Sequence, residues 1–136
     1  MNRCVTLCSV WAICFAMIIS LEGCKVQKEI MHLEVAAFET AIQVPGVYLL
    51  DVRTAEEYAE GHIKKGAQNV DVKQVDFAEV VQRLYPDKEQ IVYVYCRSGL
   101  RSMKAAHKLT DAGYKVGNLE GGFVEWMKTG KPVVKD

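Results

Sequence analysis

The segment from Cys96 to Ser102, Cys-Arg-Ser-Gly-Leu-Arg-Ser, combines a thiol with groups that favour a negative charge on sulfur. Arg97 and Arg101 follow the cysteine, and Gly99 gives the backbone access to positive φ, so that successive N–H groups can turn toward one centre. A helix that begins after this loop adds roughly half a positive charge at its N-terminus. Because thiolate is the reactive form of cysteine, the segment predicts a nucleophile at Cys96.

A cysteine at the end of a buried strand can also be a small core residue. We favour the reactive role, because a packing cysteine does not need arginines one and five residues later. The other four cysteines, Cys4, Cys8, Cys14 and Cys24, all precede the predicted domain, so Cys96 is its single thiol. With no partner for a disulfide and no Cys-x-x-Cys motif, a dithiol redox enzyme is not expected.

The elements that position this loop follow from two apolar runs, residues 47–52 and 91–95, which predict strands covered on both faces. Strands and helices alternate with short connections, which predicts an α/β fold with a parallel sheet and helices on both faces. Ligand sites in such folds lie at the carboxyl ends of the strands. Asp51 and Cys96 both fall there, and we expect Asp51 either to orient the loop or to be hydrogen bonded at its strand end.

Helical periodicity, caps and chain breakers predict the remaining elements. We expect helices over residues 33–42, 55–59, 77–84, 102–112 and 123–128, and strands over residues 67–70 and 115–119. Thr54 and Asp76 stand at N-cap positions, and Glu57 occupies the capping-box position after Thr54. Arg53 and Glu57 are four residues apart across this helix start, which predicts a structural ion pair between them.

Length and charge restrict the class of protein. The chain has 136 residues, enough for one domain with a core, and its 17 basic and 17 acidic residues give no net charge. The sequence has no stripe of basic residues, so we do not expect nucleic acid as a partner. His32 and His107 show no metal-ligand spacing with each other or with Cys96, so we expect neither a metal nor a cofactor.

The N-terminus has the outline of an export signal. A single basic residue, Arg3, precedes residues 4–21, which are uncharged and largely apolar and nearly long enough to span a bilayer. We therefore expect residues 1–23 to be a signal peptide or membrane anchor, residues 24–32 a linker, and residues 33–136 the folded domain. Either role of the leader places the domain outside the cytoplasm.

The end of this leader, Leu21-Glu22-Gly23-Cys24, resembles the lipobox of bacterial lipoproteins, although Glu22 departs from the usual small or apolar residue. The resemblance implies lipidation at Cys24 and a periplasmic protein that is anchored to the membrane through its N-terminus. An uncleaved membrane anchor and ordinary cleaved secretion are the alternatives.

Three blocks of sequence resemble the rhodanese-like sulfurtransferases in their small, single-domain form. They are Leu50-Asp51-Val52-Arg53 with Glu57-Tyr58 and Gly61-His62-Ile63, the loop from Cys96 to Ser102, and Gly121-Gly122-Phe123 with Trp126. The blocks occur in the family's order at ordinary spacing, and the resemblance covers residues 33–132. It implies the rhodanese-like fold, a parallel sheet flanked by helices on both faces.

The resemblance also implies that Cys96 carries a sulfane sulfur as a persulfide, inside a pocket lined by backbone amides. The amides are those of Arg97, Ser98, Gly99, Leu100 and Arg101, with Asp51, Arg53 and Ser102 in supporting positions. Sulfur would come from a donor such as thiosulfate or a persulfide and pass to a thiol or cyanide, by covalent catalysis in two steps. Arg97 or Arg101 is expected to meet the leaving anion, and we expect Arg101 to face solvent.

Four other functions compete with sulfur transfer. A phosphatase or an arsenate reductase also places a thiolate in an anion-binding loop. Here only four residues separate Cys96 from Arg101, fewer than in the loop of the tyrosine-type cysteine phosphatases, and the smaller ring suits one sulfur atom better than a tetrahedral oxyanion. A non-catalytic binding module usually lacks the cysteine, which is present here. A sulfur carrier with a protein relay partner would load sulfur but turn over slowly with small acceptors.

We expect His62 to belong to the scaffold rather than to act as a base, and Trp126 to pack under the loop.

Overall fold

The structure is a computed structural model that describes residues 29–136. The predicted leader, the predicted lipidation site at Cys24 and the first part of the predicted linker lie outside these residues. Within the described part of the chain, no helix is long and apolar enough to cross a membrane.

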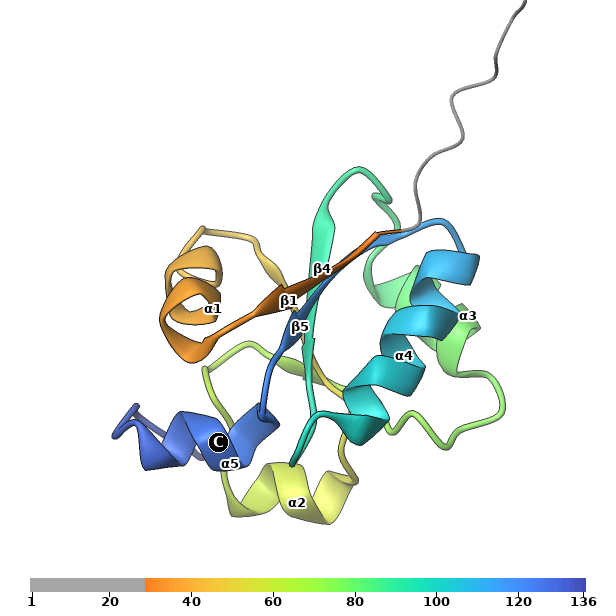
Figure 1. Cartoon of the computed structure of the whole chain (residues 1–136). Helices are drawn as coiled ribbons and strands as arrows, with labels where there is room; N and C mark the ends of the chain where they lie inside the picture. Colours follow the sequence, from red (N-terminus) through yellow and green to blue (C-terminus); the bar gives the residue numbers. More distant parts are fainter. Residues whose placement is uncertain (1–28) are drawn as a thin grey trace, which may run out of the picture.

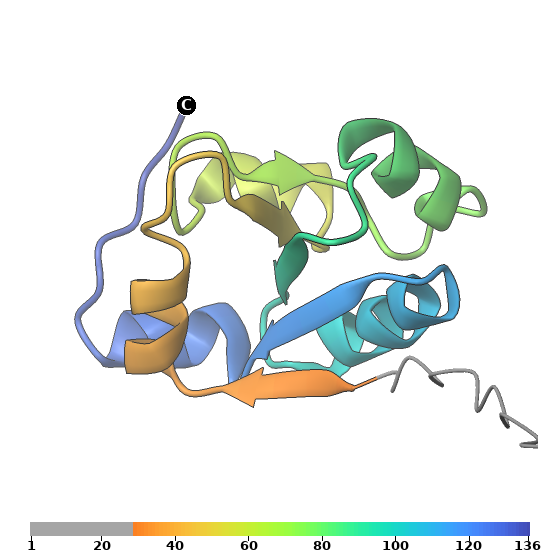
Figure 2. The same cartoon turned by 90° about the horizontal axis from the view of Figure 1, so that it is seen from above.

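Five parallel strands form one sheet in the order β1-β5-β4-β2-β3. The strands are β1 (Ile30–Leu33), β2 (Tyr48–Asp51), β3 (Gln68–Asn69), β4 (Ile91–Tyr95) and β5 (Lys115–Leu119). The helices are α1 (Val35–Ala41), α2 (Ala55–Glu60), α3 (Phe77–Leu84), α4 (Leu100–Asp111) and α5 (Gly122–Lys128). Helices α1 and α5 lie on one side of the sheet and α3 and α4 on the other, while α2 lies at the end where α4 and α5 begin (Figure 1). Strands β1 and β3 are at opposite edges (Figure 2).

Two buried clusters hold the helices against the two faces of the sheet. Because side chains alternate along a strand, β4 contributes Val92 and Val94 to the cluster under α3 and α4, and Tyr95 to the cluster under α1 and α5. Cys96 continues this alternation and belongs to the same cluster as Val94. The predicted parallel sheet with helices on both faces is therefore confirmed.

The first strand differs from the sequence prediction. Residues 30–32, which we assigned to the linker, form most of β1, and α1 starts at Val35 rather than at residue 33. β1 is an edge strand whose backbone pairs with β5 from Ile30 opposite Val116 to Leu33 opposite Leu119. Such a short segment becomes a strand because β5 offers it hydrogen bonds, and its own sequence pattern does not reveal that partner.

The starts of the helices show which local sequence signals predicted the helix boundaries correctly. Thr54 and Glu57 form the predicted capping box at α2. Asp76 does occupy the N-cap of α3, but its side chain makes no capping hydrogen bond. Helix α4 begins at Leu100, two residues earlier than expected, because Gly99 adopts a left-handed conformation with φ 104° and serves as the N-cap.

Candidate active site

Cys96 directly follows β4 at the carboxyl end of the sheet, and it is 1% exposed. The Gly99 N–H donates a hydrogen bond to its Sγ at 3.0 Å. The positive φ of Gly99 turns the chain so that this amide faces back toward the strand end. The loop therefore already directs a backbone donor at the sulfur, an arrangement that stabilises negative charge there.

Ser102 fixes the peptide that carries this turn. It is fully buried in the first turn of α4, and its Oγ donates to the Gly99 carbonyl oxygen at 3.1 Å. The Met103 N–H donates to the same oxygen at 3.1 Å. Ser102 thus supports the conformation of Gly99 and does not itself meet the sulfur in the described hydrogen bonds.

Helix α5 holds the loop from the other side. The Phe123 N–H donates to the Cys96 carbonyl at 2.8 Å, and the Val124 N–H donates to the Arg97 carbonyl at 3.0 Å. Gly122, with φ 62°, lies so close that a Cβ on it would be 2.6 Å from the Cys96 oxygen. The Gly121-Gly122 pair, part of the third block of the family resemblance, therefore permits close contact between the α5 start and the backbone of Cys96.

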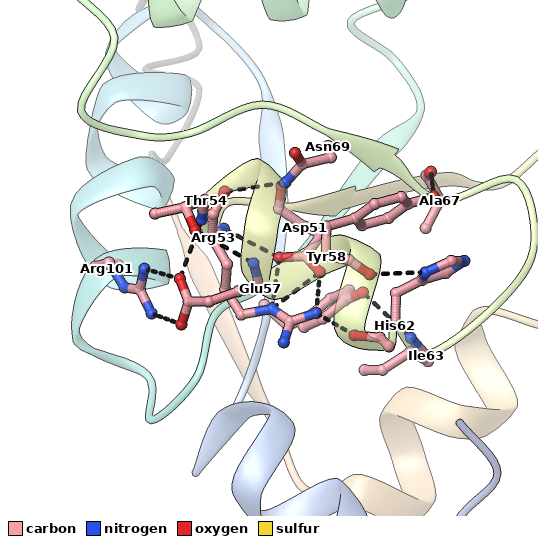
Figure 3. A network of polar contacts seen from close by, with 12 residues as sticks. Asp51, Arg53, Thr54, Glu57, Tyr58, His62, Ile63, Ala67, Asn69 and Arg101 are labelled. Carbon is pink, nitrogen blue, oxygen red and sulfur yellow. Dashed lines mark hydrogen bonds and ion pairs between the residues drawn. The ribbon is translucent and has the colours of Figure 1, made fainter. Parts of the chain in front are cut away.

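Arg101 does not face solvent, contrary to expectation. Its Nη1 and Nη2 donate to the two carboxylate oxygens of Glu57 at 2.6 and 2.8 Å, and both side chains are 24% exposed (Figure 3). The hydrogen bond from Arg101 is the main reason that the pKa of Glu57 falls to about 2. The charge of this loop arginine is thus largely satisfied by α2, which packs at the same end of the sheet.

The predicted pair between Arg53 and Glu57 is also wrong, because Arg53 pairs with Asp51 instead. The Arg53 Nε lies 2.9 and 3.0 Å from the two Asp51 oxygens, and its Nη2 reaches the Gly61 carbonyl at 2.7 Å (Figure 3). Burial alone would lower the pKa of Arg53, but hydrogen bonding to Asp51 and its charge outweigh burial, and the pKa is raised.

Asp51 and Arg53 are both buried, at 0% and 3% exposure, and they form a buried ion pair beneath the site. The guanidinium carbon lies 4.2 Å from the centre of the Phe123 ring, so the pair joins β2 to the start of α5. Of the two roles that we considered for Asp51, the hydrogen-bonded strand-end role is the one found. Its influence on the loop is indirect, through the α5 start that contacts Cys96.

His62 and Trp126 lie in the scaffold. The His62 ring is buried, stacks on Tyr58 with centroids 4.0 Å apart, and places Nδ1 3.2 Å from the Tyr58 carbonyl. The Trp126 ring packs in the α1 and α5 core, and its Nε1 donates to the Pro132 carbonyl at 2.8 Å. Neither residue contacts Cys96 in the described hydrogen bonds, which agrees with the scaffold role predicted for His62.

A cleft of about 260 Å³ lies beside the loop, between α2 and α5. We refer to it as the α2–α5 cleft, and its walls include Glu60, Arg97, Phe123, Val124, Met127 and Val133. Sequence reasoning missed this feature. The one available signal was the spacing of Val124 and Met127, three residues apart on one face of the closing helix. No group of three or more metal-ligating side chains occurs among residues 29–136.

Comparison with known proteins identifies relatives of this chain. The family model described as Rhodanese-like domain matches residues 34–129. YtwF of Bacillus subtilis is 41% identical over 106 residues, which cover 76% of this chain and 97% of that protein. Thiosulfate sulfurtransferase 18 of Arabidopsis thaliana is 35% identical over 118 residues, 78% of this chain and 85% of that protein. The solved structure of the BH2092 protein from Bacillus halodurans has a TM-score of 0.67 at 28% identity and covers 77% of each chain.

Proposed function

Because the chain belongs to the rhodanese-like domain family, we propose that it is a sulfurtransferase that carries sulfane sulfur on Cys96 as a persulfide. The hydrogen bond from the Gly99 N–H to Cys96 Sγ, at 3.0 Å, carries this proposal. A donor already directed at sulfur favours the thiolate before the reaction and the anionic persulfide after it. The amides of Arg97, Ser98, Leu100 and Arg101 complete the ring around the outer sulfur.

The reaction has two steps that balance without a separate acid or base. In the first, the Cys96 thiolate attacks the outer sulfur of thiosulfate or of a persulfide. The donor's sulfur–sulfur bond breaks, its electron pair leaves with sulfite or with the donor thiolate, and Cys96–S–S⁻ remains. In the second, cyanide or a thiolate attacks the outer sulfur of this persulfide, and the bonding pair returns to Cys96.

The two loop arginines have different roles in this proposal. Arg101 has its charge matched by Glu57, so it positions the loop and α2 relative to each other. Arg97 is exposed and has no ion-pair partner among residues 29–136. Arg97 is therefore the cation that remains free to attract an anionic donor and to meet its leaving group.

The same geometry argues against a phosphatase or an arsenate reductase. Those enzymes need the loop guanidinium to hold a tetrahedral oxyanion, whereas both terminal nitrogens of Arg101 donate to Glu57. A sulfur carrier and a non-catalytic binding module remain as alternatives that experiment distinguishes. A carrier accepts sulfur but delivers it slowly to small acceptors, and a binding module does not accept it.

The direct test is mass spectrometry of the full chain after treatment with thiosulfate. Because the chain has five cysteines, the protein is digested and each cysteine-containing peptide is measured separately. We expect the peptide with Cys96 to gain the mass of one sulfur atom and to lose it when cyanide is added. The Cys96→Ser variant is the control for sulfur held elsewhere.

Two results would overturn the proposal. One is the absence of any sulfur on Cys96 with thiosulfate and with an organic persulfide. The other is equal labelling of the leader cysteines, followed by the same thiocyanate production in Cys96→Ser as in the unmodified protein. Sulfur on Cys96 that cyanide and small thiols do not remove would indicate a carrier for a protein partner.

From the leader sequence we also propose that the domain is exported and anchored at Cys24 by lipid, with the site facing the periplasm. The intact mass of the protein isolated from membranes tests this directly. The expected mass lacks residues 1–23 and includes a lipid on Cys24, whereas retention of residues 1–23 would contradict cleavage.

A further inference from the structure

We propose that the α2–α5 cleft binds the carbon body of a small organic thiol that accepts sulfur from Cys96, and that this thiol carries both an amino and a carboxylate group. The inference rests on the proposed function, because it assigns the acceptor of the same sulfur. The cleft lies beside the loop that holds Cys96, and apart from Arg97 of that loop it involves residues in and around α2, residues of α5 and the C-terminal segment.

The cleft begins one residue from the nucleophile. Arg97 lines the cleft and directly follows Cys96, although Cys96 itself does not line it. Val124, which also lines the cleft, donates its N–H to the Arg97 carbonyl at 3.0 Å. The residue that follows Cys96 thus borders the cleft, and in this proposal the body of the thiol occupies the cleft while its sulfur reaches past Arg97 to Cys96.

The size of the cleft suits a small organic molecule. Sites for drug-sized ligands occupy roughly 300–1,000 Å³. The α2–α5 cleft, at about 260 Å³, lies just below that range. Cyanide would leave it almost empty, whereas a thiol with a short carbon chain would fill a substantial part of it. The volume therefore indicates an acceptor that has a body as well as a reacting atom.

One wall of the cleft is apolar and open to solvent. Val124 and Met127 stand three residues apart on α5, and Val133 follows from the C-terminal segment. Met127 is 48% exposed and Val133 is 40% exposed, which leaves apolar surface beside a reactive loop uncovered. In this proposal these exposed apolar side chains contact the methylene groups of the bound thiol.

The charges in the cleft decide which thiol fits. Four charged side chains line it, but Arg53 is neutralised by Asp51, and Glu57 by Arg101. Arg97 and Glu60 remain, and neither forms an ion pair within residues 29–136. One free positive and one free negative charge match a carboxylate and an ammonium group on the same ligand.

The transfer step itself balances within the proposed chemistry. The thiolate of the bound ligand attacks the outer sulfur of Cys96–S–S⁻, a new sulfur–sulfur bond forms on the ligand, and the old bond breaks. The electron pair of the broken bond returns to Cys96 as thiolate. The products are the ligand persulfide and free enzyme, and no external oxidant or reductant is needed.

The test compares acceptors of graded charge on the full chain, after Cys96 has been loaded and the loading measured by mass. The probes are cysteine, cysteamine, 3-mercaptopropionate and cyanide, with rates expressed per thiolate to remove differences in thiol acidity. Each charged group of the thiol should improve kcat/KM by roughly two- to fivefold, as expected for exposed ion pairs. Cysteine should therefore be the best of the three thiols.

Two variants connect this preference to the cleft. Glu60→Gln should lower the ratio of kcat/KM for cysteine to that for 3-mercaptopropionate by roughly two- to fivefold. Met127→Ser should lower the ratio for cysteine relative to cyanide. The matched controls are Glu79→Gln and Leu84→Ser on α3, which lies on the opposite face of the sheet, and these should leave both ratios unchanged.

Failure of this inference can be distinguished from failure of the proposed function. If Cys96 does not load, the sulfurtransferase proposal fails, and the inference fails with it before any acceptor is added. If Cys96 loads but the three thiols react alike, or Glu60→Gln and Met127→Ser behave as their α3 controls do, the cleft is not the acceptor site.

Discussion

Arg101 and Glu57 join the reactive loop to α2 across 44 residues of sequence, through two hydrogen bonds of 2.6 and 2.8 Å. The pair fixes the position of the first turn of α4, directly after the loop that holds Cys96. It also removes Arg101 from the set of free cations around the site. Glu57 therefore has two functions, since its backbone and side chain also complete the capping box of its own helix.

Removing the Glu57 charge should weaken the fold and change its pH dependence. A hydrogen bond to a charged group contributes about 1.5–3 kcal/mol, so we expect Glu57→Gln to lower the free energy of unfolding by about 1–2 kcal/mol at pH 7. The control is Glu89→Gln, whose partner Lys115 is exposed, and it should change stability by less than about 0.5 kcal/mol. Urea unfolding measures both, and equal effects would contradict a special role for Glu57.

The pH dependence follows from the lowered pKa of Glu57, about 2 in the fold against 4.5 for the ordinary group. A group with a lowered pKa binds its proton more readily when unfolded, so its stabilisation is present above pH 4.5 and is lost as the pH falls toward 2. We expect the wild type to lose more stability than Glu57→Gln over this interval. Parallel stability curves for the two proteins would exclude the Arg101 pair as the cause.

Gly122 should tolerate no side chain, because a Cβ would be 2.6 Å from the Cys96 carbonyl oxygen. Gly130 is the matched control, since it has a similar φ of 73° but a Cβ on it would meet no atom within 4 Å. Gly130→Ala should cost about 1–2 kcal/mol from left-handed strain alone. Gly122→Ala should cost at least about 1 kcal/mol more and alter the alkylation rate of Cys96. Equal losses in thermal or urea unfolding would show that the close contact is unimportant.

Asp51→Asn should be among the most damaging single changes in the domain. It leaves the buried Arg53 guanidinium without its countercharge, and loss of one partner of a buried pair costs about 3–5 kcal/mol. Asp76→Asn is the control, because Asp76 is 62% exposed and lies 3.9 Å from Arg83. Chemical unfolding of the two variants provides the comparison. A loss of less than about 1 kcal/mol in the free energy of unfolding for Asp51→Asn would argue against a structural role for the Asp51–Arg53 ion pair.

Arg97 and Arg101 should differ in their effect on anionic donors. Arg97→Gln should lower kcat/KM for thiosulfate by roughly fivefold at low salt, and this difference should shrink as ionic strength rises. Arg101→Gln should act mainly through stability and kcat, because its charge is already paired with Glu57. Steady-state kinetics at low and high salt measure both variants. If kcat/KM depends equally on salt in the two variants, neither arginine alone attracts the anionic donor.

The sequence alone predicted Cys96 as the nucleophile, and it located the loop after residues 91–95, the strands at residues 91–95 and 115–119, and the capping box of α2. Each of these depends on residues that are neighbours in the chain: an apolar run, a cap three residues from its partner, or a glycine where the backbone must turn. The family resemblance rested on the same local blocks, and it correctly implied the parallel sheet.

Only the tertiary structure decided which charges pair and where the cleft lies. By sequence, Arg53 and Glu57 are neighbours, yet Glu57 binds Arg101, 44 residues away, because α2 and the start of α4 meet at the end of the sheet. Strand β1 likewise exists because β5 provides its hydrogen bonds. Charged side chains and strands pair with the groups that lie near them in space. Those distances are set by the packing of the whole sheet and its helices, so no short stretch of sequence reveals them.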